Sequence, residues 1–262
     1  MSSQLLEAMI GAAVEAGRAI DHIYSQGFAV SRKADASPVT AADQAAEQLI
    51  LERLHACAPQ LPVVAEEEVA AGRIPEAGRE FFLVDPLDGT KEFIERRGDF
   101  TVNIALIREG SPVLGVVLAP ARQALFAADV EAGRAFRMRA SSAREPLHVR
   151  AAPAAGLTAV ASRSHRTPET DAYLARYRIA ELVSIGSSLK FCLIAGAEAD
   201  LYPRLGRTME WDTAAGHAVL LGAGGKVAAP DGRPLRYGKP DFANSWFVAS
   251  GAIETVPIET VC

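Results

Sequence analysis

Two aspartates stand three residues apart directly after an apolar run, and their spacing points to metal chemistry. The segment Asp85–Thr90 reads Asp-Pro-Leu-Asp-Gly-Thr and follows the apolar residues Phe81–Val84. The apolar run predicts a buried strand, which Pro86 and Gly89 would end. Ligands bind at the carboxyl ends of strands in open α/β sheets. Because Mg2+ prefers oxygen ligands and partners phosphate, the segment predicts a Mg2+ and phosphate site rather than a plain surface turn.

A covalent aspartyl mechanism does not fit this segment. Phosphatases that form an aspartyl-phosphate carry Asp-x-Asp-Gly-Thr after a strand, with the first Asp as the nucleophile. Here the residue two positions before Asp88 is Pro86, which has no nucleophilic group. Asp85 lies three positions before Asp88, so metal-assisted hydrolysis is the better interpretation.

The acidic run Glu66–Glu68 follows a second short apolar segment, Val63–Ala65. Taken alone, a charge run after a strand is typical of a solvated loop, and the Gly and Pro residues that follow indicate a mobile one. Beside the first motif it has a second interpretation. A carboxylate at the end of this strand would join Asp85 and Asp88 at the end of the next.

Two other aspartates stand where helices are expected to begin. Asp212, in Trp-Asp-Thr-Ala-Ala-Gly, is either an N-cap or a metal ligand, and the small residues after it would leave helix N–H groups open to a phosphate. Thr40 and Asp43 stand three residues apart before an apolar-periodic segment, which is typical of a capping box. Local spacing therefore favours the cap for Asp43 and leaves both roles open for Asp212.

A hydroxyl-rich segment with a lysine opens another predicted helix. Ser187, Ser188 and Lys190 stand at its start, and Arg204 follows further along the chain. Lysine and arginine are mostly surface residues, but hydroxyls and a lysine at a helix start can hold a phosphate. His165 lies in a polar loop, where a solvated side chain is expected.

Hydrophobic periodicity predicts a mixed chain of short strands and helices around these residues. An opening amphipathic helix of about six turns spans Leu6 to Tyr24, and a polar loop covers 31–38. A second helix carries Ala46, Leu49, Ile50, Leu54 and Cys57 on one face. Residues 140–146 are the expected hinge between two halves. Strands are predicted at 63–65, 81–84, 101–108, 113–119, 124–128, 157–162, 182–185 and 201–202, the third and fourth as a hairpin, and helices near 188–197 and 212–222.

Composition narrows the class of protein. With 262 residues, 49% of them hydrophobic, the chain can bury a sizeable core in one large domain or two packed ones. A net charge of -5 argues against nucleic-acid binding. No segment has the length of a membrane span, and the N-terminus is amphipathic rather than signal-like. Cys57, Cys192 and Cys262 lack disulfide or zinc spacing, so we expect a reduced, cytoplasmic protein.

Taken together, three segments resemble the inositol monophosphatase superfamily of Mg2+-dependent, lithium-sensitive phosphatases. They are Glu66-Glu67, Asp85–Thr90 and Trp211–Gly216, and in order they span nearly the whole chain. The two longer motifs together are highly specific. The resemblance implies the layered α-β-α-β-α sandwich of that group, an α/β (α+β) fold. An N-terminal α+β half, 1–145, would carry most metal ligands, and a C-terminal α/β half, 146–262, would carry Asp212 and the nucleotide-side residues.

Within the superfamily, the chain looks like the bacterial 3'(2'),5'-bisphosphate nucleotidase branch. The segments that carry this likeness are Ser37–Asp43, Asp88–Phe93 and Ser184–Phe191, whereas inositol monophosphatases typically have Thr-Asn in place of Lys91-Glu92. The branch removes the 3'-phosphate from adenosine 3',5'-bisphosphate, a by-product of sulfate assimilation. The alternatives are an inositol or sugar monophosphatase with the same metal core, and a catalytically silent Mg2+- or nucleotide-binding protein.

The resemblance implies two Mg2+ ions about 3.5–4 Å apart, as in other two-metal sites. Thr90 and Asp43 match the pair that orients and deprotonates the attacking water, and Glu67 would support the metal shell or a third, weaker ion. One ion would be held by Glu66, Asp85 and the Leu87 carbonyl, and the other by Asp85, Asp88 and Asp212.

The resemblance also implies how a small nucleotide substrate is held. Backbone N–H groups of Gly89 and Thr90 would bind the scissile phosphate, and Ser187, Lys190 and Arg204 the second phosphate. Peripheral association with the cytoplasmic face of the inner membrane and the oligomeric state stay open. The full set of substrate contacts would be Glu66, Leu87, Asp88, Gly89, Thr90, Ser187, Lys190, Arg204 and Asp212.

Overall fold

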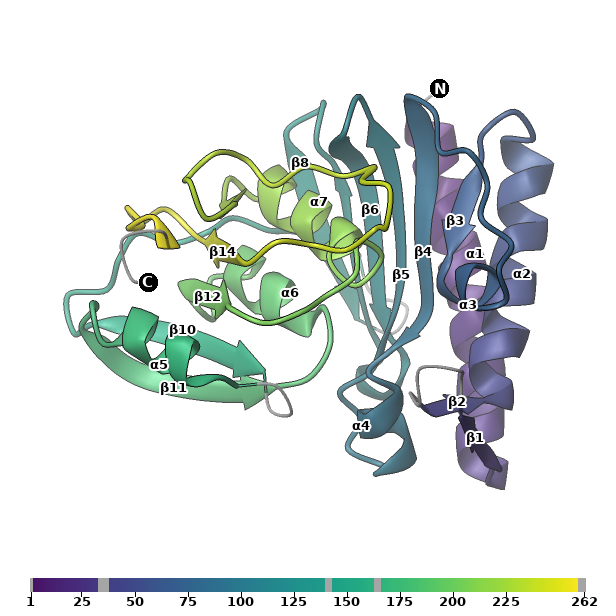
Figure 1. Ribbon diagram of the computed structural model, residues 1–262, viewed down its shortest axis with the longest axis horizontal. Helices are drawn as coiled ribbons and strands as arrows, with labels where there is room; N and C mark the ends of the chain where they lie inside the picture. The colour runs from purple at the N-terminus through teal and green to yellow at the C-terminus, as the bar shows by residue number, and fades with distance from the viewer. Residues whose placement is uncertain (1, 33–37, 140–142, 163–165, 259–262) are drawn as a thin grey trace.

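The computed structural model describes residues 2–32, 38–139, 143–162 and 166–258, which build a layered sandwich (Figure 1). Two long helices cover one face of a large sheet, and two shorter helices lie between that sheet and a smaller one. A further short helix covers the outer face of the smaller sheet. This α-β-α-β-α order confirms the predicted fold. The helices are, in the same order, α1 (Ser2–Gln26), α2 (Ala41–Cys57), α6 (Leu189–Ala195), α7 (Ala214–Gly222) and α5 (Pro168–Leu174).

The large sheet has seven strands in the order β3-β4-β5-β6-β7-β8-β9. The β3–β4 pair runs parallel, and each other neighbouring pair runs antiparallel. The predicted hairpin is the β5–β6 pair. The bounds are β3 Val63–Ala65, β4 Glu80–Asp88, β5 Thr101–Arg108, β6 Ser111–Ala119, β7 Ala124–Asp129, β8 Arg134–Arg139 and β9 Glu145–Pro146.

The smaller sheet has five strands in the order β11-β10-β12-β14-β13. Its β10 strand is parallel to both β11 and β12, so the carboxyl ends of these three strands meet at one edge. The bounds are β10 Leu157–Ser162, β11 Ile179–Ile185, β12 Leu201–Arg204, β13 Lys226–Ala228 and β14 Phe247–Ser250. The remaining short elements are β1 Val30–Arg32, β2 Pro38–Thr40, α3 Glu66–Ala70, α4 Thr90–Ile94 and the 3-10 turn η1 Pro120–Arg122.

Strands β4 to β7 of the large sheet are buried on both faces, which explains their continuous apolar runs. In β5, Ile104 and Leu106 belong to the core beneath α1 and α2, whereas Ala105 and Ile107 belong to the core shared with α6 and α7. Successive side chains of a strand point to opposite faces, so one strand serves both cores. The sheet thereby forms a rigid support whose β4 end carries the aspartate motif.

The predicted polar loop 31–38 is wrong at its ends. Val30 pairs with Thr40 and Ser31 with Val39, so β1 and β2 form an antiparallel ribbon. The paired residues lie before and after 33–37. Residues 33–37, which include Ser37 of the predicted motif, lie outside the described residues. Backbone pairing across a short reversal is not visible in residue composition, because polar residues can occupy both strands and loops.

Several other predictions need correction. The acidic run 66–68 is not a loop but the start of the short helix α3. Cys57 is exposed rather than on the buried face of α2. In the expected hinge 140–146, residues 145–146 pair with β8 as the edge strand β9, and 140–142 lie outside the described residues, as do His165 and Cys262. The elements that periodicity did not predict are β1, β2, β8, β9, β13, β14, α3, α4 and α5.

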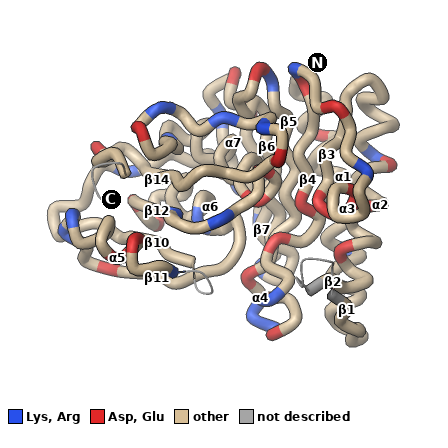
Figure 2. The backbone as a smooth tube through the Cα atoms, viewed as in Figure 1, with Lys and Arg blue, Asp and Glu red and all other residues tan. Residues whose placement is uncertain are grey.

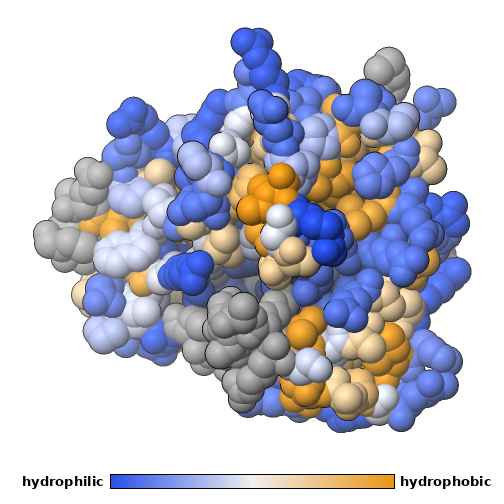
Figure 3. Space-filling view, turned by 45° about the vertical axis from the view of Figure 1, so that its right-hand side comes forward, coloured by the Kyte–Doolittle hydropathy of each residue, from blue (hydrophilic) through white to orange (hydrophobic). Residues whose placement is uncertain are grey.

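Few large apolar side chains are exposed among the described residues. Among the described residues, the large hydrophobic side chains that are exposed are Val30, Ile74 and Leu182, which lie far apart in the sequence. Hydrophilic residues dominate the face drawn in Figure 3, with separate apolar patches between them. No helix in the described part of the chain has the length and apolar character that crossing a bilayer requires.

Candidate active site

A bulge in β4 turns both motif aspartates toward the same face. Asp85 pairs with Asn103 and Asp88 pairs with Thr101, so β4 advances three residues over the length in which β5 advances two. Without that extra residue, aspartates three positions apart would point to opposite faces of the sheet. A β-bulge re-aims side chains in this way, and Pro86, which has no N–H to donate, fits one. The Leu87 N–H instead donates to the Asp85 carboxylate at 3.0 Å.

The parallel register of β3 and β4 brings the acidic run beside these aspartates. Ala65 pairs with Val84, so Glu66 and Asp85 are the next residues on neighbouring strands. The helix α3 that begins at Glu66 has no side-chain cap of its own. The Glu47 carboxylate of α2 accepts the Glu67 N–H at 2.8 Å and serves as that cap from a distance. Glu67 itself lines a separate hollow between α2 and α3 rather than the aspartate pocket.

Asp43 divides its two carboxylate oxygens between a helix cap and the motif. Its Oδ2 accepts the Thr40 N–H at 2.8 Å, and the Thr40 hydroxyl oxygen accepts a backbone N–H of the first turn, which forms the predicted capping box; the Thr40 hydroxyl also donates to Asp43 Oδ2 at 2.7 Å. Its Oδ1 accepts from the Thr90 hydroxyl at 3.3 Å, and that hydroxyl also reaches the Leu87 carbonyl at 3.3 Å. The cap holds the carboxylate still while one oxygen faces Thr90, so a structural and a catalytic role are compatible.

Gly89 gives the chain a turn that other residues would adopt only with strain. Its φ of 91° and ψ of 41° lie in the left-handed region. A Cβ at this position would stand 3.1 Å from the Asp99 carbonyl oxygen. The turn starts α4 immediately after β4, which places the Gly89 and Thr90 backbone at the pocket wall.

A pocket of about 300 Å3 collects the predicted residues from both sheets. The carboxyl end of β4 forms one wall, and the carboxyl ends of β10, β11 and β12 contribute Ser162, Gly186-Ser187 and Arg204. Acidic positions gather near β4 and α3, and both acidic and basic positions lie around α4 (Figure 2). Asp43 and Glu67 do not line the pocket. The predicted residues that do are Glu66, Asp85, Leu87, Asp88, Gly89, Thr90, Ser187, Lys190, Arg204 and Asp212.

Asp212 is not the cap of α7. That helix begins at Ala214 after Thr213, and the Asp212 carboxylate turns back to accept the Met209 N–H at 2.8 Å. Ser188 ties this segment to the first motif. Its N–H donates to Asp88 Oδ2 at 2.7 Å, and its hydroxyl donates to the Asp212 carbonyl at 2.7 Å. The Ser188 hydroxyl is therefore engaged with protein rather than turned to a phosphate.

The chemistry of the donor set fits divalent metal ions. Burial raises the pKa of Asp85 and Asp212 well above the usual range, and repulsion from neighbouring carboxylates adds to it. Burial also raises the pKa of Asp88, although the nearby Lys190 ammonium opposes this. Buried carboxylates that repel one another favour a cation among them. Among the described residues, no three His, Cys, Asp or Glu side chains form a ready-made shell.

The two predicted cations at the pocket are held by backbone carbonyls. Lys190 is 5% exposed, and its Nζ donates to the Ser187 carbonyl at 2.6 Å and the Ile185 carbonyl at 3.4 Å. Burial lowers the pKa of Lys190 to about 8. The Arg204 guanidinium donates to the Arg207 carbonyl at 2.8 Å. Both side chains are buried and held in place within the same pocket as the acidic residues.

The small residues after Asp212 pack rather than bind. Ala215 and Ala218 of α7 lie against Gly115 of β6, where a Cβ would stand 2.6 Å from the Ala215 carbonyl oxygen. Gly216 faces the Phe191 ring of α6, and a Cβ there would lie 2.5 Å from that ring. The sequence pattern that predicted an open helix start therefore reflects close contacts of α7 with β6 and α6.

Replacing Gly216 with alanine should destabilise the fold. Overpacking of a close contact costs about 1–3 kcal/mol, which should lower Tm by several degrees in a thermal melt. Gly11→Ala is the matched control, because Gly11 lies in α1 and its added Cβ would meet no atom within 4 Å. That variant should melt at the same temperature or higher. Equal melting of both variants would remove the packing argument for Gly216.

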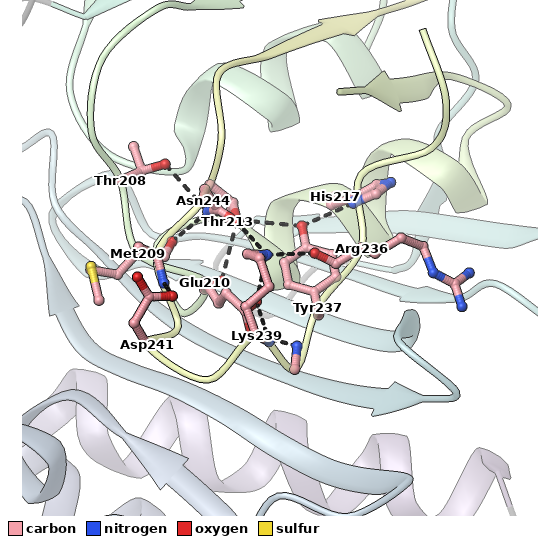
Figure 4. A network of polar contacts seen from close by, with 12 residues as sticks. Thr208, Met209, Glu210, Thr213, His217, Arg236, Tyr237, Lys239, Asp241 and Asn244 are labelled. Carbon is pink, nitrogen blue, oxygen red and sulfur yellow. Dashed lines mark hydrogen bonds and ion pairs between the residues drawn. The ribbon is translucent and has the colours of Figure 1, made fainter. Parts of the chain in front are cut away.

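His217 gives the fold a measurable pH dependence. The ring is 2% exposed on α7, its Nδ1 lies 2.9 Å from the Tyr237 hydroxyl (Figure 4), and burial lowers its pKa to about 3. The unfolded chain binds a proton near pH 6.5 and the folded chain does not, so this contribution to stability is complete above pH 6.5. It should be lost at about 1.4 kcal/mol per pH unit as the pH falls toward 3.

The measurement compares wild type with His217→Gln by urea unfolding at pH 7 and pH 5. Wild type should lose about 2 kcal/mol more than the variant between these values, because the variant lacks the titrating ring. The difference between the two proteins isolates the histidine from the acidic pocket, which both share. Parallel pH profiles would show that His217 is protonated alike in the folded and unfolded chains.

Some residues in and around the pocket had weak sequence signals. Ser188 was considered only for holding a phosphate, but its two bonds to Asp88 and Asp212 join segments 100 and 24 residues away. Asn103, which donates to Asp88 at 3.3 Å, sat inside an apolar strand, where a lone polar residue is a usable signal. Ser188 and Asn103 support the pocket from behind, whereas the residues without a predicted role that line it include Lys91, Glu92, Ser162, Tyr202 and Thr208.

Comparison with known proteins supports the family that the sequence motifs predicted. Residues 1–257 match the model of the inositol monophosphatase family. A 3'(2'),5'-bisphosphate nucleotidase CysQ from Salmonella typhimurium is 45% identical over 252 residues, covering 93% of this chain and 98% of that protein. The CysQ of Escherichia coli K12 is 44% identical over 255 residues, covering 94% and 99%. The names of these relatives agree with the predicted branch.

Solved structures agree at the level of the fold. The crystal structure of CysQ from Bacteroides thetaiotaomicron has a TM-score of 0.79 at 39% identity and covers 95% of this chain and 97% of that one. An inositol monophosphatase from Anabaena has a TM-score of 0.76 at 26% identity, with 98% of each chain covered. Enzymes of this family are generally metal-dependent, typically with Mg2+. The chain belongs to the inositol monophosphatase family.

Proposed function

We propose that this protein is a Mg2+-dependent phosphatase that converts adenosine 3',5'-bisphosphate to AMP and phosphate, in nucleotide recycling linked to sulfur assimilation. One observation carries the proposal: a single pocket is lined both by the acidic cluster around Asp85 and by the fixed cations Lys190 and Arg204. An acidic wall can hold metal ions on one phosphate while a basic wall meets a second. A bisphosphate has both groups, and an inositol monophosphate has one.

The metal ligands are assigned by the donors that line the pocket. Glu66, Asp85 and the Leu87 carbonyl would hold one ion, and Asp85, Asp88 and Asp212 a second. Bound there, divalent ions would supply charge neutralisation and lower the pKa of the attacking water. Glu67 lies over a neighbouring hollow, so a third ion would be weaker and further from the reacting phosphate.

Proton transfer is assigned to Thr90 and Asp43. The Thr90 hydroxyl donates to Asp43 Oδ1, which leaves the Thr90 oxygen able to accept a proton from water. Thr90 would orient the water, and the proton would pass toward Asp43 as the water attacks phosphorus. The bond from phosphorus to the ribose 3'-oxygen would break, and the departing oxygen would take a proton from solvent water. The capping bonds from Thr40 hold Asp43 Oδ2, so the carboxylate need not reorient during the step.

Substrate binding is assigned to the two walls. The Gly89 and Thr90 N–H groups at the start of α4 would hold the scissile phosphate. Ser187, Lys190 and Arg204 would meet the second phosphate from the ends of β11 and β12. Phosphoryl transfer depends mainly on positioning and charge neutralisation, which this division supplies.

A phosphate-release assay with Mg2+ tests the proposal. Adenosine 3',5'-bisphosphate should be hydrolysed with a higher kcat/KM than adenosine 3'-monophosphate, inositol 1-phosphate or fructose 1,6-bisphosphate. Chelation of the metal should stop the reaction with each substrate. A preference for inositol 1-phosphate would instead identify a monophosphatase of the same family. Release from none of the four substrates would favour a silent binding protein.

Lys190→Gln should separate the two phosphates of the substrate. The lysine meets only the second phosphate in this proposal, so KM for adenosine 3',5'-bisphosphate should rise by about ten- to a hundredfold. Hydrolysis of adenosine 3'-monophosphate should hardly change, because its one phosphate lies at the metals. Equal losses on both substrates would mean that Lys190 supports the pocket through the Ser187 and Ile185 carbonyls.

Organisation and location complete the proposal. We assign residues 1–145 to an N-terminal half with most metal ligands and 146–262 to a C-terminal half with Asp212, since the strands of the large sheet end at Pro146 and those of the small sheet begin at Leu157. A cytoplasmic location fits a nucleotide substrate. Peripheral contact with the inner membrane and self-association are outcomes that fractionation and light scattering would decide.

A further inference from the structure

The turn before Asp212 is fixed by a segment more than 20 residues further along the chain. In the peptide group that joins Thr208 to Met209, the N–H donates to the Asp212 carboxylate at 2.8 Å and the carbonyl accepts the Asn244 N–H at 2.9 Å. A peptide group is planar, so fixing its carbonyl also fixes the direction of its N–H. The orientation of the Asp212 carboxylate is thereby coupled to the backbone at Asn244.

The next peptide group is held in the same way. The Met209 carbonyl accepts from the Asn244 side-chain amide at 2.7 Å, and the Glu210 N–H donates to the Phe242 carbonyl at 2.7 Å. Met209 and Ala243 form an isolated antiparallel bridge between these contacts. Two consecutive peptide groups before Asp212 are therefore held by one short stretch of chain.

The Asn244 amide reaches both ends of the turn. Besides Met209, its Nδ2 lies 3.0 Å from the Thr213 hydroxyl and 3.3 Å from the Thr208 hydroxyl. Figure 4 shows Asn244 among these three residues, with Tyr237 and His217 on the side toward α7. Thr208 and Thr213 line the pocket on either side of Asp212. One side chain thus joins the residues that flank the carboxylate.

Glu210 anchors the segment that carries Asn244. The Glu210 carboxylate is fully buried and accepts the Gly238 N–H at 2.7 Å, the Lys239 N–H at 3.1 Å and the Lys239 ammonium at 2.5 Å. Hydrogen bonds to a buried charge are stronger than neutral ones. Glu210 lies in the turn that precedes Asp212, so these bonds tie that turn to the segment 236–244.

We propose that Asn244 is a positioning residue for the metal site, whose side-chain amide holds the Thr208–Thr213 turn in the conformation that presents Asp212 to the pocket. The role rests on the proposed function, because it assumes that Asp212 binds a metal ion. Residues that orient a ligand from behind commonly change metal affinity or activity by about 10–100-fold when replaced.

Mg2+ binding by isothermal titration and Tb3+ luminescence, sensitised by Trp211 beside the proposed ligand, tests the role without turnover. Asn244→Ala should weaken Mg2+ binding by about tenfold. Asn244→Asp should weaken it further, because its oxygen atoms would face the Met209 and Thr213 oxygens. Asn244→Ser keeps one donor and should lie between wild type and Asn244→Ala, and it replaces the alanine variant if that one fails to fold.

Arg236→Ala is the matched control. Arg236 lies in the same segment but donates to the Ser111 hydroxyl and the Glu109 carbonyl, away from the turn. Its loss should leave Mg2+ affinity unchanged. In an Asp212→Asn background, Asn244→Ala should cause little further weakening, because the residue acts through Asp212.

Two outcomes overturn different statements. If Asp212→Asn weakens Mg2+ binding and Asn244→Ala lowers only Tm, Asn244 has a structural role and the proposed function stands. If Asp212→Asn leaves Mg2+ binding unchanged, the metal assignment of Asp212 falls, and the role of Asn244 falls with it.

Discussion

Asp88→Asn and Asp212→Asn should each lower turnover of adenosine 3',5'-bisphosphate by at least about a hundredfold. Metal ions contribute several kcal/mol of transition-state stabilisation, and each 1.4 kcal/mol is a tenfold change in rate. Asparagine keeps the shape of the side chain and can still accept the N–H of Ser188 or Met209. It removes the charge that Mg2+ requires.

The fold should survive both substitutions. Burial raises the pKa of both aspartates, and repulsion from neighbouring carboxylates adds to it at Asp212, so a neutral side chain removes an unfavourable buried charge in protein without metal. Tm measured in chelator should therefore be equal to or higher than that of wild type. Asp231→Asn is the control for the same chemical change, because Asp231 pairs with Arg233 on the surface and should keep full activity. Wild-type turnover by either pocket variant at ordinary Mg2+ concentration would contradict the metal assignment.

Asp43→Asn and Thr90→Ala should lower kcat by about a hundredfold with a smaller change in KM. Transfer of a proton by a positioned group contributes about 10²–10⁴-fold to rate, and its loss is felt mainly in the transition state. The amide oxygen of Asp43→Asn can still accept from Thr40, so the α2 cap and Tm should be retained. Thr90→Ser keeps the hydroxyl and should keep most of the rate.

Asp43→Asn and Thr90→Ala together distinguish a catalytic role of Asp43 from a purely structural one. Steady-state kinetics with adenosine 3',5'-bisphosphate and a thermal melt of each variant give the two readouts. Loss of rate with an unchanged melting temperature supports the assignment of Asp43 Oδ1 to proton transfer. A wild-type kcat in Asp43→Asn would leave Asp43 with its capping role alone.

The sequence located the chemistry more sharply than the scaffold. Strand periodicity put Asp85 and Glu66 at the ends of neighbouring strands, and the parallel β3–β4 register brings them side by side. The capping box at Asp43 was also visible, because its partners lie within one helical turn. Such features depend on short spacing and residue type, which a single chain displays directly.

Features that depend on distant partners were missed. The edge strand β9 and the strand β13 are short and have little periodicity, so only pairing with neighbours defines them. The Ala-Ala-Gly run after Asp212 suggested a phosphate site. The small side chains instead allow α7 to pack closely against Gly115 and Phe191. A small residue can mean either close packing or an exposed backbone, and only the neighbour distinguishes the two.

By itself, the sequence determined which residue types stand at strand and helix ends, and hence a family fold and a set of acidic ligands. The tertiary structure alone decided their common direction. The extra residue in β4 turns Asp88 to the face of Asp85, Ser188 ties Asp88 to Asp212, and Asn244 holds the turn behind it. These contacts join residues up to 100 positions apart, and their geometry arises only when two sheets and the helices between them pack together.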